Sequence, residues 1–166
     1  MDQPDDLLWA RQHWQQAGTI ALQAASETEL ARFAQQYRVQ LPADLVRYFA
    51  FVNGTGGEYD EPFFRFYSLA EVQSVAGRFH DYHGVPKYSD LLHTWPEHGH
   101  FYVFADYMIH LFAYAIRLDR LLAATNPVFV LCGGMYQPIA ESFTAFLALY
   151  KRDSAVLYMG EEEVAD

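Results

Sequence analysis

The side chains that could perform chemistry here are seven histidines, one cysteine and several adjacent carboxylates. His80 and His83 are three residues apart with Asp81 between them, which is the nearest approach to a metal-binding pattern. A zinc site needs three or four converging ligands, and the sequence has neither a second cysteine nor a His-Glu-x-x-His motif. We therefore predict no bound metal. A small metal- or ligand-binding protein or enzyme, using His80, His83 and residues 84–99, is the alternative hypothesis.

The other reactive groups lack the neighbours that catalysis requires. Cys132 stands alone in an apolar segment, so it can form no disulfide within the chain, and we expect a buried, unreactive thiol. Ser142 has none of the flanking glycines of a nucleophile elbow. The glycines of residues 54–57 follow a predicted helix, whereas a phosphate-binding loop follows a strand. The sequence therefore indicates no catalytic residue and no cofactor.

The charge of the chain excludes several classes of partner. It carries 21 acidic and 11 basic residues, for a net charge of −10. This balance disfavours nucleic acids and anionic membrane surfaces, and it suits a basic protein partner. The chain begins with Asp2, Asp5 and Asp6, whereas a secretory signal peptide begins with basic residues, so we expect a cytoplasmic protein. Residues 121–140 carry no charge, but prolines and glycines interrupt them, so no membrane-spanning helix is predicted.

Three helices are predicted in the first third of the chain. Residues 4–17 form the first, and a Ser-x-x-Glu capping box at residues 26–29 opens the second. Residues 41–52 form the third, with apolar side chains at helical spacing. Asn53 and Gly54 end it, because both tolerate the left-handed backbone conformation.

A strand, a helix and a long loop are predicted next. Residues 63–66 form the strand, and a second capping box, at residues 68–71, is expected to open a helix that reaches Phe79. Residues 84–99 read as a loop, and loops of this length in compact domains are usually functional or mobile.

The second half of the chain is predicted to supply most of the sheet. Residues 100–105 and 110–118 are expected to be antiparallel strands joined by a turn at 106–109, followed by one helical turn at 118–124. Residues 128–131 are uniformly apolar and predict a buried strand that ends at two glycines. A closing amphipathic helix is predicted from Ile139, Phe143, Phe146, Leu147 and Tyr150.

Short motifs recur in an order typical of one family. They are LP at 41–42, NG at 53–54, FYSLAEV at 66–72, FADY at 104–107, FAYAI at 112–116, PVFVL at 127–131 and IAESFTAFL at 139–147. Over about residues 26–152, their order and spacing resemble the SUKH superfamily, which includes fungal cell-wall assembly regulators and many bacterial immunity proteins. The resemblance implies a protein-binding role, either immunity to a toxin or a scaffold, and implies no catalytic residue. Residues 84–99 match no element of the family.

The sequence thus predicts an α+β fold, with N-terminal helices packed on an antiparallel or mixed sheet of about four to six strands and a closing C-terminal helix. One domain is expected over residues 1–160, with its core at 26–152 and an acidic tail at 161–166.

Two irregular segments are predicted to bind the partner, because aromatic anchors supply affinity and charge controls encounter. Their residues are Glu58, Tyr59, Asp60 and Glu61 in one segment, and Tyr88, Trp95 and His98 in the other. A non-catalytic protein-binding module with these loops would suit a basic toxin domain. The alternative for Tyr88 and Trp95 is that they tether residues 84–99 to the protein's own core.

Overall fold

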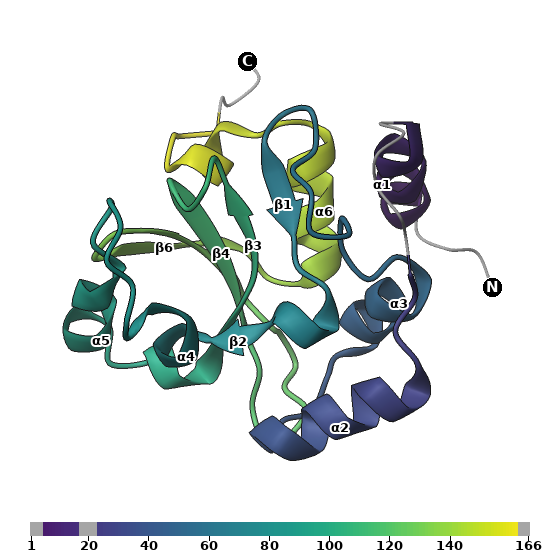
Figure 1. The fold of residues 1–166 in the computed structure, drawn as a ribbon, viewed down its shortest axis with the longest axis horizontal. Helices are drawn as coiled ribbons and strands as arrows, with labels where there is room; N and C mark the ends of the chain where they lie inside the picture. Colours follow the sequence, from purple (N-terminus) through teal and green to yellow (C-terminus); the bar gives the residue numbers. More distant parts are fainter. Residues whose placement is uncertain (1–4, 17–22, 163–166) are drawn as a thin grey trace.

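An antiparallel sheet forms the centre of the fold, and helices cover both of its faces (Figure 1). The computed structural model describes residues 5–16 and 23–162. Within these residues the sheet has six strands in the order β1-β3-β4-β5-β6, and β2 also pairs with β3. They are β1 (Phe64–Phe66), β2 (Gln73–Ser74), β3 (Phe101–Tyr107), β4 (Phe112–Arg117), β5 (Val128–Cys132) and β6 (Met135–Ala140). The predicted α+β class and strand number are confirmed.

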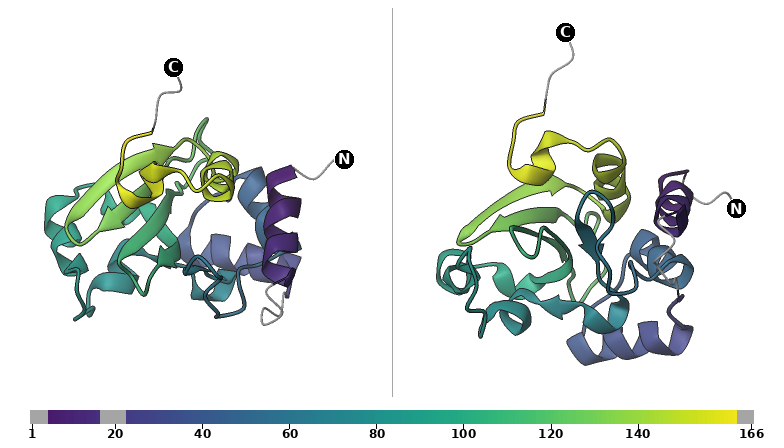
Figure 2. Two further views of the ribbon diagram at one scale, coloured as in Figure 1. Left: turned by 90° about the horizontal axis from the view of Figure 1, so that it is seen from above. Right: turned by 45° about the horizontal axis from the view of Figure 1, so that its top comes forward.

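The two faces of the sheet are covered by different parts of the chain (Figure 2). On one face Phe146 of the closing helix packs against Phe104, with ring centroids 5.0 Å apart. On the other face Tyr88 donates a hydrogen bond to the Leu131 carbonyl, at 3.3 Å. The helices are α1 (Asp5–Gln16), α2 (Glu27–Tyr37), α3 (Ala43–Phe51), α4 (Val75–Phe79), α5 (Leu91–Thr94) and α6 (Phe143–Lys151).

The predicted capping signals of the first helices are confirmed. The Ser26 and Glu29 side chains each accept a hydrogen bond from the other's backbone N–H, at 3.2 and 2.7 Å. Asn53 and Gly54 follow α3 with φ of +55° and +83°. A Cβ at Gly54 would lie 2.6 Å from the Phe66 carbonyl oxygen, so only glycine fits between the end of α3 and the end of β1.

Aromatic side chains fill the core between α6, α3 and the sheet. Phe49 and Phe143 are each 1% exposed, which confirms their predicted burial. Trp14 of α1 is also fully buried, and its indole N–H donates to the Tyr150 hydroxyl of α6 at 2.9 Å. Buried tyrosines and tryptophans need such partners because an unpaired polar atom is costly in an apolar core.

The helix predicted to run from residue 68 to Phe79 is wrong. The capping box at residues 68–71 closes only one 3₁₀ turn, η1 (Leu69–Glu71). The chain then extends as β2, where Gln73 pairs with Val103, and the Ser74 hydroxyl caps the new helix α4. Pairing with β3 thus overrides the local tendency to continue the helix.

Two predictions around the central strands also need correction. Strand β3 continues to Tyr107, so the turn begins at Met108 rather than at residue 106. Residues 118–124 form no helical turn: Leu118 donates to the His100 carbonyl at 2.9 Å, and the chain then bends at residues 120, 121 and 124 without regular structure. Leu121 is consequently 79% exposed.

Strand β6 was not predicted, and Ile139 was wrongly placed in the closing helix. Gly133 and Gly134 reverse the chain between Cys132 and Met135, and the next residues pair with β5. Helix α6 begins only at Phe143, after the N-cap Ser142. Because β6 pairs on one side only, it tolerates the proline and the polar side chains that concealed it in the sequence.

Candidate partner-binding site

The loop before β1 is fixed by buried polar side chains. Thr55 is fully buried, and its hydroxyl donates to the Glu58 carbonyl at 2.6 Å. Asp60 is 5% exposed and accepts hydrogen bonds from the Phe64 N–H, at 2.7 Å, and from the Tyr150 hydroxyl. Burial raises the pKa of the Asp60 carboxyl, while these two bonds favour its charged form. Asp60 therefore holds the loop from inside and is not available to a partner.

Tyr59 also turns inward, and it leaves two carboxylates outside. Its hydroxyl donates to Asp106 at 2.7 Å. Burial, with the Asp106 carboxylate as a second cause, raises the pKa of this hydroxyl. Glu58 and Glu61, on either side, are exposed, and within the described residues neither forms an ion pair. Of the four predicted loop residues, these two are free to meet a partner.

Asp106 is the central residue that sequence reasoning missed. It is fully buried in β3 and accepts hydrogen bonds from the hydroxyls of Tyr59 and Tyr67, at 2.7 and 2.6 Å, and from the His110 backbone N–H at 3.2 Å. The feature of the sequence that could have identified Asp106 is a charged residue within an otherwise apolar strand. An aspartate inside an apolar strand must be paired, because an unpaired buried carboxylate is very unfavourable.

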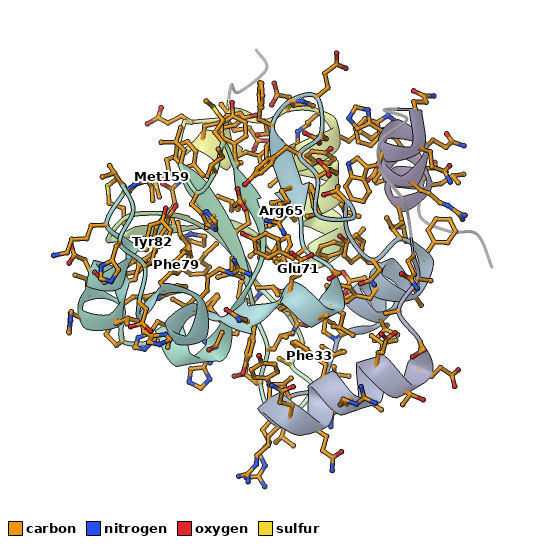
Figure 3. The ribbon with its side chains drawn as sticks, viewed as in Figure 1. Phe33, Arg65, Glu71, Phe79, Tyr82 and Met159 are labelled. Atoms are coloured by element: carbon orange, nitrogen blue, oxygen red, sulfur yellow. The ribbon has the colours of Figure 1, made fainter. Side chains whose placement is uncertain are left out.

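Two arginines lie over the outer side of this network. The guanidinium carbons of Arg78 and Arg65 are 4.1 and 5.4 Å from the centre of the Tyr67 ring. Arg65 forms an ion pair with Glu71, and Arg78 donates to the Glu71 carbonyl at 2.8 Å. Figure 3 shows Arg65 and Glu71 side by side near the middle of the molecule. The positive charges of Arg65 and Arg78 help to balance the buried Asp106 carboxylate, which lies beneath Tyr67.

His110 completes the network. Its Nε2 atom lies 3.2 Å from the Tyr67 hydroxyl and 3.7 Å from the Asp106 carboxylate. Burial lowers the pKa of His110, an effect that Asp106 partly opposes. No serine or cysteine takes part in these contacts, and burial raises the pKa of the half-buried Cys132 thiol. These contacts fix the backbone of the turn and the hydroxyls of the two tyrosines.

Tyr88 and Trp95 lie in the core, as the tether alternative describes. They are 0% and 2% exposed. Trp95 stacks on Phe129 and on Tyr136, with centroid separations of 5.1 and 4.9 Å, and His98 Nδ1 lies 2.8 Å from the Trp95 carbonyl oxygen. The predicted loop is a run of short helices, namely η2 (Tyr88–Asp90), α5 and η3 (His98–His100). Both aromatic residues are thereby removed from the exposed candidate surface, and His98 is half-buried.

The histidines of the alternative hypothesis do not converge. Helix α4 ends at Phe79, so His80 and His83 do not share a helical face. His80 Nε2 lies 2.8 Å from Asp81, and both side chains are exposed. Across residues 5–16 and 23–162, no group of three or more His, Cys, Asp or Glu side chains could hold a metal ion. In the same ranges, no helix is both long and apolar enough to cross a membrane.

A protein-family model matches most of the chain. The model of the SMI1 / KNR4 family (SUKH-1) matches residues 24–149, a span that begins just before α2 and ends within α6. All six described strands and the Asp106 network lie inside it. No curated protein matches the chain.

Proposed function

The chain belongs to the SMI1 / KNR4 family (SUKH-1), and on that premise we propose that it is a non-catalytic protein-binding module that neutralises a toxin domain or serves as a regulatory scaffold. The family is associated with immunity proteins and cell-wall regulators, and the SUKH resemblance of the sequence is confirmed by the match. We further propose that the partner is a basic protein domain.

One observation carries the proposal. The loop before β1 is held by Thr55 and Asp60 from inside, yet Glu58 and Glu61 stand exposed on it. A rigid loop loses little conformational entropy on binding, so its charges are ready to engage a partner. In a chain of net charge −10, two such carboxylates attract a basic surface and accelerate its encounter.

The experiment compares two double variants of equal charge. Glu58→Gln with Glu61→Gln alters the loop, while Glu27→Gln with Glu141→Gln removes two exposed carboxylates elsewhere. Helix α2, which begins at Glu27, lies at the opposite end of the molecule from the loop (Figure 1). Proteins captured by each form from cells that naturally produce the chain are quantified by mass spectrometry. The protein that depends on Glu58 and Glu61 is then purified.

We expect the loop variant to slow association with the purified partner by about tenfold at low salt, and this difference to shrink as salt is raised. The control variant should change the rate by less than about twofold, since its charges lie far from the interface. If the partner is a toxin, co-expression of the wild-type chain should also restore growth. Equal effects of the two variants, or a loss of affinity unaffected by salt, would refute the proposed role of the loop.

A further inference from the structure

We infer that the turn between β3 and β4, together with Phe63, forms the apolar centre of the partner interface, and that the partner presents an apolar cleft rimmed by lysines or arginines. This inference rests on the proposed function and adds the residues that supply affinity. The four apolar side chains, which we name the hairpin platform, are Phe63, Met108, Ile109 and Leu111, exposed by 58%, 48%, 74% and 40%.

The backbone of the platform is in an unfavourable conformation. Met108, Ile109 and His110 are three consecutive left-handed residues, with φ of +47°, +53° and +68°, and Phe63 has φ of +75°. A β-branched residue such as Ile109 is rarely found there, because its side chain crowds the backbone. Hairpin turns that need positive φ normally use glycine, asparagine or aspartate. This turn instead carries methionine, isoleucine and histidine at its left-handed positions, and the side chains of Met108, Ile109 and the following Leu111 are exposed.

Buried groups hold the turn in this conformation. The Asp106 carboxylate accepts from the His110 N–H at 3.2 Å, and the Tyr88 hydroxyl donates to the His110 carbonyl at 2.7 Å. Across the sheet, the Met108 N–H donates to the Phe63 carbonyl at 2.9 Å. The exposed side chains therefore stand on a fixed support. Strained backbone of this kind persists only where its surroundings determine it, and it concentrates at functional sites.

The hairpin platform is continuous with residues 58–61, which we name the acidic loop. The Phe63 N–H donates to the Asp60 carbonyl at 3.0 Å, and Glu61 is two residues away in the chain. In Figure 1 the loop before β1 and the β3–β4 turn lie at the same end of the sheet. The surface thus combines exposed apolar side chains with the exposed carboxylate of Glu61 at its edge, and Glu58 lies further along the same loop, where its backbone bonds to Thr55. This is the pattern of an interface with an apolar core and a polar rim.

The exposed carboxylates of Glu58 and Glu61 determine which kind of partner fits this surface. A second copy docked through the same surface by two-fold symmetry would bring Glu58 and Glu61 toward their own equivalents, in a chain of net charge −10. A basic protein would instead pair with them while its apolar cleft covers Ile109 and Met108. We therefore assign the hairpin platform to a basic protein partner and not to self-association.

The first experiment places a photo-crosslinking p-benzoylphenylalanine at position 109 of the full chain, in cells that naturally produce it. The same residue at position 121 is the matched control, since Leu121 is also apolar and 79% exposed but follows the other end of β4. A third position, 61, reports on the acidic loop. We expect the same heterologous protein to be captured from positions 109 and 61 and not from 121.

The second experiment measures the affinity of the purified captured protein for Ile109→Asp, Met108→Asp and Leu121→Asp by calorimetry. Aspartate tolerates left-handed backbone, so the first two variants should keep their wild-type melting temperature. We expect them to weaken binding about 30-fold or more, because apolar anchors at the centre of an interface dominate its affinity. Leu121→Asp should change it by less than about twofold, as a substitution outside the interface.

The outcomes separate this inference from the proposed function. Capture from position 61 but not from 109, or equal affinity of Ile109→Asp and wild type, overturns the hairpin platform and leaves the protein-binding function standing. Capture from none of the three positions counts against both. An adduct between two copies, with a dimer in sedimentation that Ile109→Asp abolishes, overturns the choice of a basic partner in favour of a second copy.

Discussion

Removal of the buried Asp106 carboxylate should destabilise the fold strongly. Asp106→Ala leaves three donors without their acceptor, namely the Tyr59 hydroxyl, the Tyr67 hydroxyl and the His110 N–H. Each buried donor left unpaired costs about 1–3 kcal/mol. Tyr59 is only partly buried and can reach water, and the Tyr67 hydroxyl keeps its contact with His110 Nε2 at 3.2 Å, so the shares of both tyrosines lie at the low end of that range. We expect a total loss of about 3–5 kcal/mol, a large part of a typical unfolding free energy of about 5–15 kcal/mol.

Urea unfolding followed by tryptophan fluorescence measures this loss, since Trp14 and Trp95 are buried and will report unfolding. With a urea dependence of about 1–3 kcal/mol per molar, the midpoint should fall by roughly 1–5 M. Asp106→Asn keeps one acceptor oxygen and should cost about half as much. Asp81→Ala, whose side chain is 84% exposed, is the matched control and should cost less than about 0.5 kcal/mol.

A double-mutant cycle with Tyr67→Phe tests the reasoning itself. In the wild-type background this change removes a hydrogen bond to a carboxylate and should cost about 1.5–3 kcal/mol. In the Asp106→Ala background the Tyr67 hydroxyl keeps only its contact with His110 Nε2, so its removal should cost clearly less. A cost that is the same in both backgrounds, or an Asp106→Ala loss below about 1 kcal/mol, would show that the network does not hold the turn.

Three further predictions concern single residues. Trp95→Ala should lower the free energy of unfolding by about 3–5 kcal/mol in urea titration, because the ring is 2% exposed, and a loss below about 1 kcal/mol would contradict its place in the core. Gly54→Ala should yield little folded protein by circular dichroism, since its φ is +83° and its Cβ would lie 2.6 Å from the Phe66 oxygen; wild-type melting would disprove this. Burial lowers the pKa of His110 in the folded protein from its ordinary value of 6.5. As the pH drops below 6.5, the unfolded chain therefore takes up a proton on His110 more readily than the folded chain, and the free energy of unfolding should fall. His110→Asn should reduce that fall between pH 7.5 and 5.5, measured by urea titration against His83→Asn, and equal slopes would count against the buried histidine.

Signals that act within a few residues could be identified from the sequence. The capping box of residues 26–29 and the left-handed stop at Asn53 and Gly54 appear as predicted, because their partners lie within one helical turn. The apolar strands of the second half were also found, since burial requires their composition. Local pattern failed at residues 68–79 and at β6, where pairing with a neighbouring strand decides the backbone.

The candidate site depends on contacts between distant parts of the chain. The sequence correctly identified the acidic loop as irregular, but it could not show that Asp60 faces Tyr150, 90 residues away, or that Tyr59 meets Asp106, 47 residues away. Those two contacts direct half of the loop inward and leave Glu58 and Glu61 outside. Residue type and spacing set which backbone conformations are locally favourable, whereas the direction of each side chain follows from how the sheet and helices pack, because only packing determines which polar groups lose contact with water and must find a partner.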